Sequence, residues 1–276
     1  MDLEDLETGA GKTWCPGCHN FMVLQAVKNA IVEHSEENDL EWEKYSMATG
    51  IGCHGKMFDY LDIGGVYSLH GRVIPTLTGM KIGNPNLVPI GFGGDGDTYS
   101  EGISHLVHAA RFNPDAAMVV HNNRAFALTT GQATPTTGKG SVTKAQPQGH
   151  FEEAINPIEL AISNDTSFVA RAYPRNISQT TEILREAMEW DGFALVDLIS
   201  PCLAYNIDVM DLEDRMYYME NHNPRDKQKA FSKAVEWEKG DKLPLGIFYR
   251  KSKDTMVERR PQLEELAEDD KAWFMK

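Results

Sequence analysis

The stretch LVPIGFGGDGDTYSEG, residues 87–102, decides the fold of this chain. It begins with a short apolar run, which is typical of a buried strand, and continues into a glycine loop that fits the pattern G-x-G-x-x-G. Apolar residues then recur on one helical face as far as Arg111, and AAMVV at 116–120 resembles a second buried strand that runs into HNN. Residues 87–123 therefore predict two parallel strands joined by a helix in a right-handed crossover.

Further elements follow from the same periodicities, and the chain contains no internal repeat. The patterns predict strands at 167–173 and 193–200, helices at about 18–34 and 177–188, a loop at 129–143, and, in a charged C-terminal part, helical stretches near 211–239 and 261–272 with a strand at 246–249. Alternating strands and helices indicate an α/β fold, with a mainly parallel sheet and helices on both faces. We expect one domain over residues 1–207 and a C-terminal extension over 208–276, which binds a partner or covers a cofactor.

Composition excludes several classes of function. The chain has 276 residues and a formal net charge of −14, whereas nucleic acids and anionic membranes are bound by basic surfaces. No apolar run approaches the roughly 20 residues of a spanning helix, and the start MDLEDLE has no signal-peptide pattern. The sequence predicts a cytoplasmic protein that binds neither nucleic acid nor membrane.

The glycine loop has two interpretations. A dinucleotide-binding loop requires an acid about 20 residues on, at the end of the second strand, but Asp115 precedes that strand and the strand ends in His121 and two asparagines. A diphosphate held by Mg²⁺ requires oxygen ligands instead, and Asp95 and Asn123 offer them from two neighbouring strand ends. A helix after Asp97 would direct its positive N-terminus at the phosphates. This combination favours thiamine diphosphate over a nicotinamide dinucleotide.

The four cysteines are too few for a disulfide scaffold. Cys15 and Cys18 form a CxxC in WCPGC, Cys53 follows GIG, and Cys202 follows SP just beyond a predicted strand. Glycine or proline flanks each of them, as is typical of chain that turns around a bound centre. The CxxC alone suits a zinc site or a redox dithiol, and four thiolates suit either zinc or a [4Fe–4S] cluster.

In order and combination, the motifs of residues 14–202 resemble those of a known family, the β subunits of the 2-oxoacid:ferredoxin oxidoreductases. The matching pieces are WCPGC at 14–18, GIGC at 50–53, HGR and TG within 70–79, NP at 84–85, GDGD at 94–97, HAAR at 108–111, NN at 122–123, LTTGQATPT at 128–136 and SPC at 200–202. The resemblance implies a thiamine diphosphate-binding fold.

The resemblance also implies roles for individual residues. Mg²⁺ would be held by Asp95, Asn123 and the carbonyl of Ala125, and one [4Fe–4S] cluster by Cys15, Cys18, Cys53 and Cys202. Cofactor contacts would come from Ile51, Gly52, His54, Gly94, Gly96, Asp97, Asn122, Leu128 and Thr129. Catalytic or substrate-facing positions would be His70, Arg72 and Thr130. Relatives often have a small residue at the position of His54, and Thr130 occupies a position that varies among relatives.

The implied reaction is the reversible, coenzyme A-dependent oxidative decarboxylation of a 2-oxoacid, 2-oxoglutarate or pyruvate, with electrons passed through the cluster to ferredoxin. The implied partners are an α subunit, which supplies the glutamate that activates the cofactor, and ferredoxin or a ferredoxin-like subunit, in a dimer of αβ units. Two alternatives stay open on the residues alone. A non-redox thiamine diphosphate-dependent decarboxylase or synthase does not need four cysteines, and a zinc-stabilised, non-catalytic subunit does not need the Mg²⁺ ligands.

Overall fold

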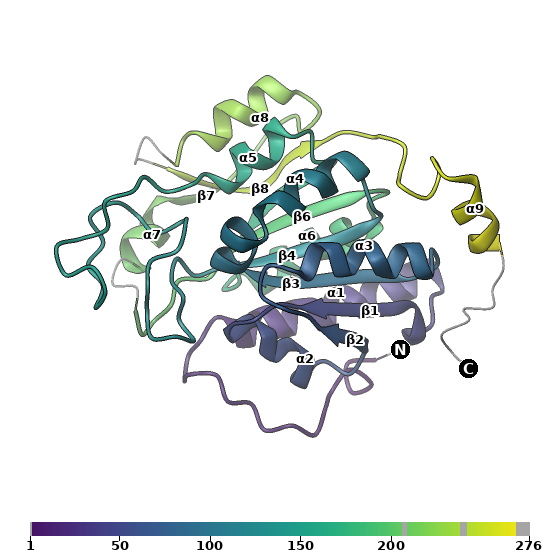
Figure 1. Ribbon diagram of the computed structural model, residues 1–276, viewed down its shortest axis with the longest axis horizontal. Coiled ribbons are helices and arrows are strands. Elements are labelled where there is room, and N and C mark those ends of the chain that lie inside the picture. The colour runs from purple at the N-terminus through teal and green to yellow at the C-terminus, as the bar shows by residue number, and fades with distance from the viewer. Residues whose placement is uncertain (1, 206–208, 238–241, 269–276) are drawn as a thin grey trace.

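The computed structural model describes residues 2–205, 209–237 and 242–268. Within these residues the chain forms an eight-stranded sheet with the order β2-β1-β3-β4-β6-β5-β8-β7 (Figure 1). Every neighbouring pair is parallel except β5 and β8. The strands are β1 (Tyr45–Thr49), β2 (Gly64–Tyr67), β3 (Val88–Gly94), β4 (Ala116–Asn122), β5 (Phe168–Ala172), β6 (Phe193–Ile199), β7 (Met216–Tyr218) and β8 (Leu243–Arg250).

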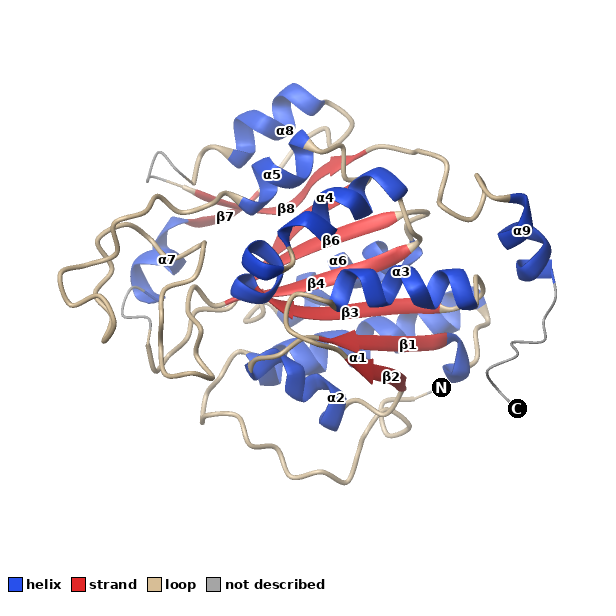
Figure 2. Ribbon diagram, in the orientation of Figure 1, coloured by secondary structure: helices blue, strands red, loops and turns tan. Residues whose placement is uncertain are grey.

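Helices cover both faces of this sheet, as Figure 2 shows. They are α1 (Asn20–Asn38), α2 (Met57–Tyr60), α3 (Val73–Gly83), α4 (Ile103–Phe112), α5 (Pro157–Ser163), α6 (Ile177–Glu189), α7 (Val209–Arg215), α8 (Lys227–Ala234) and α9 (Pro261–Glu268). One buried cluster packs α1 and α6 against the sheet, and a second packs α3, α4, α5 and α8 against it. Val119 belongs to the first cluster and its neighbours Met118 and Val120 to the second, because successive side chains of a strand face opposite ways. The predicted α/β fold with helices on both faces is confirmed.

The predicted strand–helix–strand unit is β3, α4 and β4, and its two strands are parallel. The predicted strands at 167–173 and 193–200 are β5 and β6, with α6 between them, and the strand at 246–249 lies within β8. A five-residue π-helical turn, Asp97–Glu101, precedes α4, so the helical backbone begins directly after the glycine loop.

The predicted helical stretches near 211–239 correspond to the end of α7 and to α8, with a strand between them that was not predicted. α7 ends at Arg215, and β7 and a loop separate it from α8. Residues 238 and 239 of that stretch, residues 269–272 of the last predicted helix, and the domain boundary at 207/208 lie outside the described residues. β8 pairs with β5, so the chain beyond residue 208 contributes to the same sheet as the chain before it.

The strand order creates a place for a ligand. β1 and β3 are neighbours in the sheet. The chain leaves β1 for β2, which lies on the side of β1 away from β3, and it leaves β3 for β4, which lies on the side of β3 away from β1. Loops that leave neighbouring strands in opposite directions open a crevice at the carboxyl ends of those strands. The segments after β1, β3 and β4 meet there. Among the described residues, no helix is both long enough and apolar enough to cross a membrane.

Candidate active site

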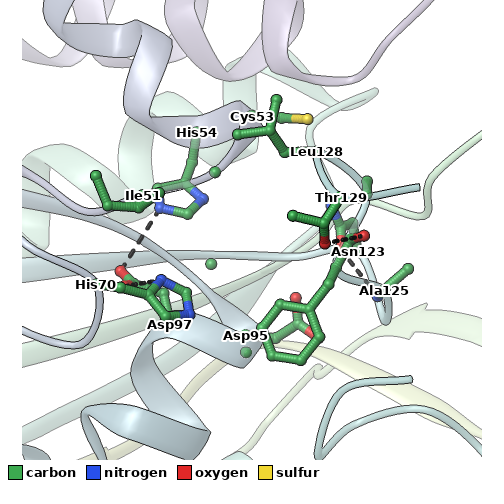
Figure 3. A pocket seen from close by; sticks show the side chains of 15 residues that line it. Ile51, Cys53, His54, His70, Asp95, Asp97, Asn123, Ala125, Leu128 and Thr129 are labelled. Atoms are coloured by element: carbon green, nitrogen blue, oxygen red, sulfur yellow. Dashed lines mark hydrogen bonds and ion pairs between the residues drawn. The ribbon is translucent and has the colours of Figure 1, made fainter. Parts of the chain in front are cut away.

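A cavity of about 280 Å³ lies at the carboxyl ends of β1, β3 and β4 (Figure 3). It is lined by Ile51, Gly52, Cys53, His54, His70, Gly94, Asp95, Gly96, Asp97, Asn123, Ala125, Phe126, Ala127, Leu128 and Thr129. In Figure 3, His54 and His70 lie on one side of the cavity, and Asn123, Ala125 and Thr129 on the other. The structure thus brings together four chain segments that are separate in the sequence: residues 51–54, His70, 94–97 and 123–129.

Asp95 follows the last residue of β3, and its side chain is 1% exposed. Burial raises the pKa of this carboxyl group, while hydrogen bonds from Thr134, Thr136 and the backbone of Asn123 favour the charged form. The Thr136 hydroxyl lies 2.7 Å from Asp95 Oδ2 and 3.0 Å from Asn122 Oδ1. Asp95 and Asn123 therefore lie next to each other at two adjacent strand ends, as the Mg²⁺ prediction requires.

Glycine is required at two positions of the site, Gly96 in the cavity lining and Gly50 just before the loop that carries Ile51. A Cβ atom would overlap the Phe126 ring at Gly96 and the Asp97 carboxylate at Gly50. The missing Cβ atoms let these two side chains pack against the backbone of the site. Glycine N–H groups beside the start of a helix are suited to binding an anion such as a diphosphate.

Asp97 connects the two histidines of the cavity. Its carboxylate accepts from the Gly71 backbone N–H at 2.5 Å and lies 2.9 Å from His70 Nδ1 and 3.5 Å from His54 Nε2. Because Asp97 is buried, these contacts offset the free-energy cost of removing its carboxylate from water. Both imidazole rings thus lie beside one buried carboxylate at the cavity.

A third histidine, His121, lies behind the cavity. Its ring centroid is 5.9 Å from that of His54, and its Nδ1 lies 2.9 Å from Asn20 Oδ1. Burial lowers the pKa of His121 well below its ordinary value, and the neighbouring His54 ring acts in the same direction. A neutral imidazole at this position donates from Nδ1 to the Asn20 amide oxygen and adds no charge behind the cavity.

The cysteine-bearing segments are connected by hydrogen bonds that end on backbone carbonyl groups. The Trp14 indole N–H donates to the carbonyl of Cys53 at 2.8 Å, which joins the CxxC segment to the loop after β1. His19 Nδ1 lies 3.2 Å from the carbonyl of Pro201, which joins the same segment to the chain that carries Cys202. The Cys202 N–H, in turn, donates to the Asn123 carbonyl at 3.4 Å.

All four thiols are free. Burial raises the pKa of Cys53 to about 11, and the thiols of Cys18, Cys202 and Cys15 contribute in the same direction. Among the described residues, no three or more His, Cys, Asp or Glu side chains form a group that could hold one metal ion. A [4Fe–4S] cluster makes a different demand, because each thiolate binds a separate iron atom and the four sulfurs need not converge on one point.

Comparison with known proteins places the chain in a family. Residues 50–198, more than half of the chain, match the family described as thiamine pyrophosphate enzyme, C-terminal TPP binding domain. Residues 209–265 match the family that describes the C-terminal part of the pyruvate ferredoxin oxidoreductase beta chain. A 2-oxoacid:ferredoxin oxidoreductase subunit beta of Saccharolobus solfataricus is 40% identical over 263 residues, which cover 90% of this chain and 84% of the relative. The chain belongs to the β subunits of the 2-oxoacid:ferredoxin oxidoreductases.

Other relatives of this β subunit carry more specific names. A 2-oxoglutarate synthase subunit KorB of Archaeoglobus fulgidus is 35% identical over 257 residues, covering 92% of this chain and 89% of the relative. A solved structure, 2-oxoglutarate:ferredoxin oxidoreductase from Magnetococcus marinus with 2-oxoglutarate, coenzyme A and succinyl-CoA bound, is similar at a TM-score of 0.89 and 30% identity, covering 100% of this chain and 95% of that chain. The chain is therefore a subunit of an oxidoreductase with the thiamine pyrophosphate-enzyme fold.

Some predicted site residues of the β subunit do not line the cavity. Arg72 donates to the carbonyls of Gly71 and Glu101, and Thr130 is exposed beside a separate surface hollow. Asn122 is fully buried below the cavity, where its amide donates to Asp197 at 3.0 Å. Of the four cysteines, Cys53 alone belongs to the cavity lining.

The structure also adds residues that sequence reasoning missed. Phe126 lines the cavity, with its ring centroid 6.0 Å from that of His70, and Thr136 binds the carboxylate of Asp95. In the sequence, the only indication that Phe126 belongs to the site is its position between the NN and LTTGQ motifs. Thr136 is the last residue of the LTTGQATPT motif, but no spacing in the sequence connects it with Asp95, which lies 41 residues earlier.

Proposed function

We propose that this β subunit binds thiamine diphosphate with Mg²⁺ and one [4Fe–4S] cluster, and that with an α subunit it catalyses the coenzyme A-dependent oxidative decarboxylation of a 2-oxoacid. Electrons from the substrate would leave through the cluster to ferredoxin. The observation that carries the proposal is the cavity itself, where Asp95, Asn123 and Ala125 lie beside the Cys53 loop.

The donor set suits the proposed cofactors. One carboxylate, one amide oxygen and one backbone carbonyl are hard oxygen ligands of the kind that Mg²⁺ takes together with phosphate oxygens. Thiamine diphosphate, when bound, supplies the nucleophilic carbon and the electron sink for decarboxylation. The chain would hold the diphosphate between Asp95, Asn123 and the glycine backbone, and it would present His70 from the opposite side of the cavity.

An α subunit is part of the proposal because the β subunit leaves apolar side chains exposed around the cavity. Ile51 and Leu128 belong to the lining and are 40% and 60% exposed, and Leu69, next to His70, is 74% exposed. Exposed apolar side chains at the mouth of a site are suited to burial by a partner. The relatives named subunit beta support the same proposal, and a dimer of αβ units is the assembly we propose.

For the substrate we propose 2-oxoglutarate. Relatives over most of this chain are named 2-oxoglutarate synthase subunits, and the similar solved structure holds 2-oxoglutarate and succinyl-CoA. Pyruvate is the second candidate, because residues 209–265 match a family described from pyruvate ferredoxin oxidoreductase. Arg72 and Thr130 stay predictions as catalytic or substrate-facing residues, as do the cytoplasmic location and the division at 207/208.

The test is an anaerobic assay of iron, sulfide and zinc on the αβ complex, with both chains expressed in the same cells. We expect about four iron and four sulfide per αβ unit, and a brown absorbance that is bleached by 2-oxoglutarate plus coenzyme A. A parallel panel with pyruvate and other 2-oxoacids identifies the preferred acid. Cys202→Ala is the matched variant, and it should lose most of the bleachable absorbance.

Three outcomes would contradict the proposal. Zinc without sulfide would make the cysteines a structural zinc site. Turnover that releases CO₂ without iron would make the protein a non-redox thiamine diphosphate enzyme. Full iron content and normal electron transfer in Cys202→Ala would remove Cys202 from the cluster ligands.

A further inference from the structure

Trp237, in the C-terminal part of the chain, contacts two arginines: Arg171, which is buried in β5, and Arg124, which is half-buried in the loop just after β4. Its ring centroid lies 4.3 Å from Arg124 Cζ and 4.5 Å from Arg171 Cζ. The indole itself is 9% exposed. The contact therefore connects the segment after α8 with residues that are 113 and 66 positions earlier in the chain.

Arg124 lies between the two residues that we propose as Mg²⁺ ligands, Asn123 and Ala125. Its φ of +58° is in the left-handed region, which a residue with a side chain adopts only when its surroundings stabilise it. The Arg124 carbonyl accepts from the Thr137 hydroxyl at 2.8 Å, and the Ala125 N–H donates to Asn123 Oδ1 at 3.0 Å. The direction of both proposed ligands depends on this one turn.

Arg171 connects the same tryptophan to the strand below the site. It is fully buried, and its Nε lies 3.3 Å from Asp197 Oδ2, while Asp197 Oδ1 accepts from the Asn122 amide at 3.0 Å. Within the described chain, Nη1 and Nη2 of Arg171 have no hydrogen-bond partner. The Arg171 guanidinium instead faces two aromatic rings, that of Trp237 and that of Phe248, whose centroid is 5.5 Å from Arg171 Cζ. Such rings attract a cation through their faces.

We propose that Trp237 is a positioning residue for the Mg²⁺ and diphosphate site: by holding the side chain of Arg124, it fixes the turn that directs Asn123 and the Ala125 carbonyl into the cavity. The inference rests on the proposed function. The segment after α8, which carries Trp237, would thus contribute to cofactor affinity as well as to any partner binding.

The experiment is a calorimetric titration of the cofactor-free αβ complex with thiamine diphosphate at several Mg²⁺ concentrations. Trp237→Leu keeps an apolar side chain and removes the aromatic face, so we expect its Mg²⁺ dissociation constant to rise about tenfold. Trp237→Phe restores an aromatic face and should stay within about threefold of the wild type. Saturating Mg²⁺ should restore diphosphate binding in Trp237→Leu, which loss of fold stability alone would not produce.

The matched control is Trp42→Leu, an exposed tryptophan just before β1, at the end of that strand opposite the site. It should bind as the wild type does. If Trp237→Leu does not assemble, Arg124→Met removes the same contact from the other side and should show the same Mg²⁺ dependence. Where both variants assemble, their effects should be less than additive in the double variant.

Two results would overturn the inference separately. The positioning role alone is refuted if the wild-type complex binds thiamine diphosphate with Mg²⁺ and the Trp237→Leu or Arg124→Met complex binds it with the same affinity. A wild-type complex without Mg²⁺-dependent binding would refute the proposed Mg²⁺ site, and the positioning role with it.

Discussion

Asp95 shows how a single buried residue is prepared for a cation. The carboxylate lies in a protein interior that disfavours charge, and burial accordingly raises its pKa. Neighbouring hydroxyl and backbone donors favour the ionised form, and a bound Mg²⁺ would favour it further. The glycine motif identified Asp95, whereas its hydroxyl donors come from a different segment of the chain.

Replacement of Asp95 tests the Mg²⁺ site directly. We expect Asp95→Ala to abolish Mg²⁺-dependent binding of thiamine diphosphate, because the only carboxylate of the proposed ligand set is removed. The visible absorbance of the cluster should be unchanged, since the cysteines lie in other segments. Calorimetry and absorbance on the same anaerobic sample check both parts, and retained cofactor affinity would exclude Asp95 as a ligand.

Thr136→Val tests the donor to Asp95 with a side chain of similar shape. A hydrogen bond to a charged group contributes about 1.5–3 kcal/mol, so we expect Mg²⁺ affinity to fall by about tenfold or more. Thr136→Ser keeps the hydroxyl and should bind Mg²⁺ almost as the wild type does. Equal affinity of the valine and serine variants would show that the 2.7 Å contact does not support the carboxylate.

At the scale of an element, the end of α4 is fixed by one buried asparagine. Asn113 has a φ of +54° and ends the helix in the left-handed conformation. Its Oδ1 accepts from Ser167 Oγ at 2.8 Å and from the Phe193 N–H at 2.9 Å, and its Nδ2 donates to the carbonyls of Lys253 and Asp254 at 3.2 and 3.3 Å. One side chain thus joins α4 to three later segments.

We expect Asn113→Ala to lower the free energy of unfolding by about 2–4 kcal/mol, because buried donors and acceptors lose their partner and the left-handed backbone becomes strained. Asn113→Gly loses the same hydrogen bonds without the strain, so it should be about 1 kcal/mol less destabilising. Urea denaturation of the three proteins measures the difference. Equal destabilisation by alanine and glycine would show that the backbone conformation contributes nothing.

At the scale of the whole molecule, Asp165 connects the chain before residue 205 with the C-terminal part. Its carboxylate lies 2.5 Å from Lys227 Nζ at the start of α8 and 2.9 Å from Lys251 Nζ just after β8. Partial burial acts to raise the pKa of Asp165, but hydrogen bonds from Lys227 and Lys251 dominate and lower it to about 2. Folding therefore favours the ionised carboxylate.

The sign of the pH effect follows from this pKa. Because the folded-state pKa is below the ordinary value, the stabilisation is complete above about pH 4 and is lost as pH falls toward 2. Asp165 is partly exposed, so we expect a contribution of no more than about 1 kcal/mol. Urea denaturation of the wild type and Asp165→Asn should differ at pH 6 and converge near pH 2; a difference that does not depend on pH would contradict the ion-pair explanation.

The elements that the sequence predicted and those that it missed differ in local pattern. β3, α4 and β4 have clear periodicities and were predicted with their parallel pairing. β2 has the sequence GGVY and is exposed along its length, so it gives no signal of a buried strand. α3, VIPTLTGMKIG, includes a proline and a glycine and has apolar residues on every side, so it gives no amphipathic pattern.

The sequence by itself determined the local elements with strong periodicity, the residue types at the ends of β3 and β4, and the family, because these depend on neighbours along the chain or on short motifs. Only the tertiary structure decided that β8 pairs antiparallel to β5, that Thr136 reaches Asp95, and that Trp237 contacts Arg124. Each of these contacts joins residues that are far apart in the chain, and strand order and burial decide which of them meet. Periodicity describes which face of an element is buried, but it does not specify what the face is buried against.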